Sequence, residues 1–144
     1  NQRGEPYRTF REEGRRGLRL ERRLAAPPEE VWHLLVDPGE AATWLTTLNI
    51  EPRVGGLYTL SFDNGMPTSR GHITVFEPPS LLEFGWYEGE AIASRVRIEL
   101  RPDDGATVLV LTHTLLQDTD DLQPFAEGWT YHLERLAKQV AERG

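Results

Sequence analysis

The sequence contains no cysteine, which excludes disulfides, a thiolate nucleophile and thiolate metal ligands. No run approaches the ~18 apolar residues that a membrane-spanning helix needs, and no signal-peptide pattern opens the chain. The patterns H-x-H, H-E-x-x-H and G-x-S-x-G do not occur. We therefore expect a cytoplasmic protein with no cofactor, no metal and no membrane partner.

Charge is unevenly distributed along the 144 residues. The net charge is −7, yet the first 23 residues hold eight Arg against four Glu, so the remainder carries −11. A basic arm can contact nucleic acid or can be a solvated terminus, and an acidic body argues against nonspecific nucleic-acid binding. We predict a flexible basic arm over residues 1–17, a single folded domain over residues 18–144 and no nucleic-acid partner.

One long amphipathic helix is predicted over residues 121–143. Its apolar residues recur in steps of three and four, which places them on one stripe. Asp121 and the residues before it provide carboxylates for the N-terminal end. Gly128 is unexpected within a helix, and we interpret it as a site of close packing rather than of a bend beside a cavity. The stripe comprises Leu122, Phe125, Ala126, Trp129, Leu133, Leu136 and Val140.

Most of the remaining chain has the period of two that is typical of strands. Proline and acidic residues predict a short helix that begins at 27–30 and ends at Asp37-Pro38, with a second short helix over 39–44. Short connections between successive strands imply antiparallel pairing. The expected fold is α+β, with a curved antiparallel sheet of about seven strands wrapped around the long C-terminal helix. The strands are expected at 18–24, 50–54, 57–62, 71–76, 81–87, 94–100 and 106–115.

Several short motifs, taken in order, resemble the START-like (SRPBCC) superfamily and, within it, the activator of heat shock protein 90 ATPase homologue-like group. The resemblance covers roughly residues 18–140 and implies a helix-grip fold. The family includes ligand carriers, cyclases, hydrolases and a co-chaperone domain, so the fold alone does not define the activity. The motifs are Leu20-Glu21-Arg22, Ala26-Pro27-Pro28-Glu29-Glu30-Val31-Trp32, Asp37-Pro38, Trp44-Leu45, Glu51-Pro52-Arg53-Val54-Gly55-Gly56, Gly71-His72-Ile73, Glu77-Pro78-Pro79, Leu82-Glu83-Phe84-Gly85-Trp86, Leu111-Thr112-His113 and Glu127-Gly128-Trp129.

The resemblance also implies a ligand cavity between the long helix and the concave face of the sheet. The alternative is an ordinary core in which the aromatic rings pack against Leu and Val. The residues that we expect to line the site are Trp44, Tyr58, Leu60, Phe62, Phe84, Trp86, Val96, Ile98, Leu111, His113, Trp129, His132 and Leu133.

The histidines are the only candidates for chemistry in this site. His113 has the strand parity of Leu109 and Leu111, and His132 follows Trp129 by one helical turn. The two could anchor a ligand or act as general acid and base, or each could be a hydrogen-bonded core histidine. No nucleophile, base and oxyanion donor assemble in the sequence, so we assign no catalytic residue.

Three functions are consistent with the sequence. The first is a non-enzymatic protein that binds a small apolar molecule. The second is an interaction module of the stress response that contacts a chaperone, and the third is a cyclase- or hydrolase-like enzyme that uses the pocket histidines. An exposed sheet edge would also permit a homodimer.

Overall fold

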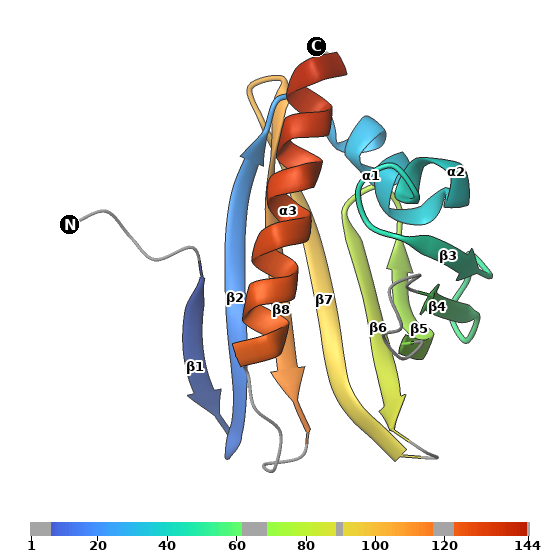
Figure 1. Cartoon of the computed structure of the whole chain (residues 1–144), viewed down its shortest axis with the longest axis vertical. Coiled ribbons are helices and arrows are strands. Elements are labelled where there is room, and N and C mark those ends of the chain that lie inside the picture. The colour runs from blue at the N-terminus through green and yellow to red at the C-terminus, as the bar shows by residue number, and fades with distance from the viewer. Residues whose placement is uncertain (1–6, 62–68, 89–90, 117–122, 144) are drawn as a thin grey trace.

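The computed structural model describes residues 7–61, 69–88, 91–116 and 123–143. Its strands form one antiparallel sheet in the order β1-β2-β8-β7-β6-β5-β4-β3 (Figure 1). The strands are β1 (Arg8–Glu12), β2 (Arg15–Leu24), β3 (Thr47–Ile50), β4 (Leu57–Ser61), β5 (Ser69–Glu77), β6 (Leu81–Glu88), β7 (Ala91–Asp103) and β8 (Ala106–Leu115). The helices are α1 (Pro28–Val36), α2 (Pro38–Ala41) and α3 (Gln123–Arg143).

Alternation along β7 defines the two faces of the sheet. Val96 and Ile98 are buried, whereas Arg95 is exposed on the opposite face. On that outer face Arg97 forms an ion pair with Glu83 of β6, with an Nη1–Oε1 distance of 3.3 Å. Such partly exposed pairs contribute little to stability, so the buried face is the source of the folding energy.

The helix α3 packs against β2 and crosses in front of β2 and β8 (Figure 1). Trp129, Leu133, Leu136 and Val140 are all buried, as the predicted stripe requires. The ladder between β2 and β8 pairs Leu18 with His113 and Leu20 with Leu111. The first predicted strand and the last strand therefore form the floor beneath the helix.

Short helices α1 and α2 form a corner at one end of the sheet (Figure 1). Asp37 separates them, and its side chain accepts a hydrogen bond from the Glu40 amide at 3.0 Å, which caps α2. The sequence predicted the second helix over 39–44, but α2 ends at Ala41, and Trp44 lies beyond it.

The flexible arm predicted over residues 1–17 is wrong for the described part of that segment. Residues 8–12 form β1, and β2 already begins at Arg15, so the sheet has eight strands rather than about seven. Phe10 covers Gly17 on the neighbouring strand, where an added Cβ would lie only 2.3 Å from its ring. The Arg19 guanidinium lies 5.1 Å from the same ring.

A second correction concerns the strand predicted at 50–54. The strand β3 instead ends at Ile50, which pairs with Tyr58 of β4, and residues 51–56 form the connection. The other predicted strands and the fold class are confirmed. Register shifts between Ile73 and Val75 and between Trp86 and Tyr87 mark irregularities that bend a sheet.

Candidate functional site

Six ring-bearing side chains from β4, β6, β8 and α3 are linked by ring-to-ring contacts, and we call them the aromatic cluster. Tyr58 and Phe84 stack with centroids 4.2 Å apart, and Phe84 is 5.4 Å from Trp86. Trp86 lies parallel to Trp129, with an interplanar angle of 4° and centroids 5.9 Å apart. The cluster is Tyr58 of β4, Phe84 and Trp86 of β6, His113 of β8, and Phe125 and Trp129 of α3.

His113 is the polar centre of this cluster. Its ring is edge-to-face with Trp86 at 5.5 Å and lies 4.5 Å from Phe125. The Trp129 indole Nε1–H donates to His113 Nδ1 at 2.9 Å, so the neutral imidazole carries its proton on Nε2. Burial lowers the pKa of His113 to about 3, which keeps the ring neutral at neutral pH.

Trp44, which is outside the cluster, and Tyr58, which is a member of it, both hydrogen-bond to the α1 corner. Trp44 donates from its indole to the Leu34 carbonyl at 2.7 Å, and the Tyr58 hydroxyl donates to the Leu35 carbonyl at 2.9 Å. These carbonyls belong to the last turn of α1, where helix carbonyls lack intrahelical partners. Trp44 and Tyr58 therefore position the corner, and burial raises the pKa of the Tyr58 phenol above its ordinary range.

Trp86 and His113 each retain a buried polar atom with no partner in the described protein. Those atoms are Trp86 Nε1 and His113 Nε2. A buried donor without an acceptor costs about 1–3 kcal/mol, so such atoms are rare and require an explanation. Both atoms are N–H donors, and they belong to two rings in direct contact.

Gly71 on β5 makes room for Trp86. The two residues are paired in the β5–β6 ladder. A Cβ on residue 71 would lie 2.4 Å from the Gly85 carbonyl oxygen and 2.7 Å from Trp86 Cδ1. Only glycine allows the indole to lie at this position without displacement of the β6 backbone.

The prediction of close packing at Gly128 is wrong. An added Cβ there would meet no atom of the described residues within 4 Å outside the local helix backbone. Gly128 lies one turn before His132 on α3, and His132 Nδ1 is 3.3 Å from the Trp44 carbonyl oxygen. Gly128 is therefore not in close contact with a neighbouring segment of the described chain.

The structure gives the two candidate histidines different partners. His113 bonds to Trp129, whereas half-buried His132 lies against the Trp44 carbonyl. The pKa of His132 is lowered, chiefly by burial and further by the Arg135 charge, although the contact with Trp44 opposes the shift. The acid–base role suggested for this pair stays a prediction.

Twelve of the thirteen predicted site residues fall within the described chain, and Phe62 lies outside it. His132 is half-buried and Trp86 is partly buried. The sequence did not assign Phe125 or Gly71 to the site, although the four-residue spacing from Phe125 to Trp129 places them on one helix face. The buried members are Trp44, Tyr58, Leu60, Phe84, Val96, Ile98, Leu111, His113, Trp129 and Leu133.

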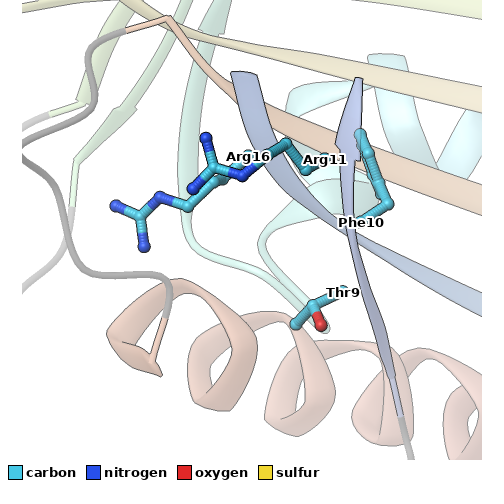
Figure 2. Close-up of a pocket in the computed structure, with 4 residues that line it drawn as sticks. All are labelled: Thr9, Phe10, Arg11 and Arg16. Atoms are coloured by element: carbon cyan, nitrogen blue, oxygen red, sulfur yellow. The ribbon is translucent and has the colours of Figure 1, made fainter. Parts of the chain in front are cut away.

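A separate surface pocket of about 430 Å³ lies at the β1–β2 hairpin. Thr9, Phe10, Arg11 and Arg16 line it, and the guanidinium groups of Arg11 and Arg16 extend to the same side (Figure 2). The pocket is open and contains no residue of the aromatic cluster. It was missed because these residues were assigned to the arm.

Within the described ranges, no three His, Asp or Glu side chains are grouped so that they could hold a metal ion. Among the helices that the structure describes, none combines the length and the apolar character needed to cross a bilayer.

Comparisons with known proteins identify relatives of the same fold. CalU16 from Micromonospora echinospora is 26% identical with a TM-score of 0.75, covering 93% of this chain and 83% of CalU16. CV1439 from Chromobacterium violaceum is 27% identical with a TM-score of 0.73, and the match covers 86% of this chain and 96% of CV1439. MLL2253 from Mesorhizobium loti is 25% identical with a TM-score of 0.77, and the match covers 88% of this chain and 97% of MLL2253. A search among curated proteins gave no match.

A family model matches most of the chain. The model described as "Activator of Hsp90 ATPase homolog 1-like protein" matches residues 25–141. This range contains every member of the aromatic cluster and both short helices. The resemblance inferred from the motifs is thereby confirmed: the chain belongs to the Activator of Hsp90 ATPase homolog 1-like family of the START-like (SRPBCC) superfamily.

Proposed function

We propose that this protein binds a small, largely apolar molecule against the aromatic cluster, without catalysing a reaction on it. The observation that carries the proposal is the pair of buried, unpartnered donors on Trp86 and His113, set among aromatic rings. Apolar walls with a few precisely placed polar groups are the usual features of small-molecule sites.

The same geometry favours binding over acid–base catalysis. A general base works best when its pKa lies near the operating pH. His113 is far from that condition, because burial lowers its pKa to about 3 and its Nδ1 already accepts from Trp129. The nitrogen that remains is a proton-bearing donor, which can hold an acceptor atom of a ligand.

A chaperone-binding function receives less support from the surface. The large apolar side chains that are exposed in the described chain are Val54, Leu57 and Tyr131. Val54, in the β3–β4 connection, and Leu57, at the start of β4, lie three residues apart in the sequence, and Tyr131 is on α3, so only three such side chains are exposed in the described chain and they come from two regions. Interaction surfaces are marked by contiguous apolar patches rather than by scattered residues.

Native mass spectrometry of the protein purified from its own host tests the binding function. We expect a reproducible small-molecule adduct on the wild-type protein, and its loss in Trp86→Ala and Trp129→Ala variants that remain folded. Trp32→Ala is the matched control, because Trp32 is also a buried indole but packs edge-to-face on Phe76, outside the cluster. This variant should keep the adduct.

Two results would contradict the proposal. One is a wild-type mass without any adduct, together with capture of the host's chaperone by the same preparation, which would favour the interaction function. The other is an adduct that persists unchanged in both cluster variants, which would locate the bound molecule elsewhere on the protein.

A further inference from the structure

The unpartnered atoms of the aromatic cluster constrain the chemistry of its ligand. Trp86 Nε1 can only donate a hydrogen bond. His113 Nε2 is also a donor, because Nδ1 of the same neutral ring accepts the Trp129 indole proton. The third indole donor nearby, on Trp44, is already bonded to the Leu34 carbonyl. The cluster therefore presents two N–H donors, on rings whose centroids are 5.5 Å apart, and both lack an acceptor in the described protein.

The position of the two rings in the sheet makes this arrangement rigid. His113 is fixed on β8 between Leu18 of β2 and Val96 of β7. The Trp86 side chain on β6 packs against Gly71, which has no side chain to displace it, and its ring lies parallel to that of Trp129. Neither ring can turn toward solvent to satisfy its nitrogen without disrupting this packing. A preorganised donor pair in an apolar surrounding is a recognition element for an acceptor.

We propose, as an extension of the proposed binding function on which it rests, that the ligand is an aromatic or polycyclic molecule with a carbonyl oxygen that accepts from both Trp86 Nε1–H and His113 Nε2–H. A carbonyl has two acceptor sites and no proton of its own to place, so it matches two donors. A hydroxyl would require an additional acceptor for its proton. An anionic oxygen would bury a charge, and the cluster contains no cationic side chain to pair with it.

Matched probes separate the carbonyl from the apolar body of the ligand. We would compare 2-acetylnaphthalene with 2-isopropylnaphthalene, and acetophenone with cumene, by isothermal titration of the purified protein. Within each pair the shapes are similar, but only the ketone has an acceptor oxygen. We expect the wild-type protein to bind each ketone about 3- to 10-fold more tightly per satisfied donor than its hydrocarbon partner.

Three substitutions test the donors individually. Trp86→Phe keeps an aromatic ring but removes Nε1–H. His113→Asn keeps an acceptor near the Nδ1 position for Trp129 and removes the Nε2–H donor, whereas His113→Gln keeps a donor near Nε2. We expect Trp86→Phe and His113→Asn each to lose about 3- to 10-fold in ketone affinity while hydrocarbon affinity stays within about twofold. His113→Gln should retain more of the ketone preference than His113→Asn.

The outcomes distinguish failure of this inference from failure of the binding function. Equal binding of ketone and hydrocarbon by the wild-type protein would overturn the carbonyl inference and leave the apolar site intact. An equal loss of both probes in the variants would likewise overturn it, because the substitutions would then act through packing. Absence of binding for all four probes would overturn the binding function and the inference together.

Discussion

Acidification should destabilise this protein through His113, which is completely buried on the inner face of β8. Its pKa is lowered from the ordinary value of 6.5 to about 3 because burial disfavours the charged imidazole. The unfolded chain therefore binds a proton below about pH 6.5 that the folded chain does not bind until about pH 3. Stability is fully present above the unfolded value and is lost progressively as the pH falls through this window.

The size of this loss of stability follows from the pKa values of His113 in the unfolded and folded chains. Between about pH 7.5 and about pH 5, the unfolded state gains roughly 2 kcal/mol from protonation of this one histidine, whereas the folded state gains almost nothing. Half-buried His132 contributes in the same direction, because its pKa is also lowered. The wild-type free energy of unfolding should thus fall by at least about 2 kcal/mol over this range.

Urea unfolding at the two pH values, on the wild-type protein and on His113→Asn, provides the assay. The variant can be less stable at both pH values, but the difference between them should be smaller by roughly 2 kcal/mol than in the wild-type protein. His33→Asn, which removes an exposed histidine on α1, is the control for loss of any imidazole. An unchanged acid-induced loss in His113→Asn would refute the assignment of a buried neutral imidazole.

Three substitutions test the packing around the site. Gly71→Ala should destabilise the fold by about 1–3 kcal/mol and change the tryptophan fluorescence, because the added Cβ would displace Trp86 or the β6 backbone. Gly128→Ala should instead raise the thermal midpoint, with a gain of up to about 1 kcal/mol, because nothing obstructs the methyl group; a loss would show that the space is filled. Tyr58→Phe should cost about 1–3 kcal/mol in chemical unfolding because the Leu35 carbonyl loses its donor, and an unchanged stability would mean that water replaces the hydroxyl.

Helices and strands whose apolar residues recur at regular intervals could be predicted from the sequence. The apolar residues of α3 recur every three or four positions, and the helix buries that stripe. In β7 the buried Val96 and Ile98 alternate with Arg95, which is exposed, and Arg97, which is partly exposed. These patterns arise directly from burial of one face, and they were sufficient for the fold class, whereas the family was inferred from the resemblance of the short sequence motifs.

The β1–β2 hairpin could not be recognised because its signals are indirect. Only Phe10 on β1 is partly buried, so the strand lacks an apolar alternation. Its turn residues Glu13 and Gly14 both have positive φ angles, 53° and 78°. A turn of this kind usually contains Asn-Gly or Asp-Gly, so the Glu-Gly pair in this sequence did not indicate a hairpin turn. The strand is paired along its length with β2, a contact between segments that no local pattern reveals.

The roles of the aromatic residues were likewise beyond the sequence. Trp44 and Trp86 are the same residue type in similar apolar surroundings, and the sequence assigned both to the ligand site. The difference arises from tertiary structure, because the last turn of α1 provides an acceptor for Trp44 and none for Trp86. Which donors remain for a ligand can be decided only after the hydrogen bonds of the folded chain are known.

The most direct test of the account is a titration of 2-acetylnaphthalene followed through the indole N–H resonances in ¹H–¹⁵N spectra, with Trp86→Phe used for assignment. We predict that the Trp86 resonance shifts downfield as its proton gains an acceptor. The Trp44 resonance should stay nearly constant, because its proton is already bonded to the Leu34 carbonyl. A titration in which Trp86 does not respond, or responds no more than Trp44, would contradict the claim that the aromatic cluster is a ligand site with donors reserved for that ligand.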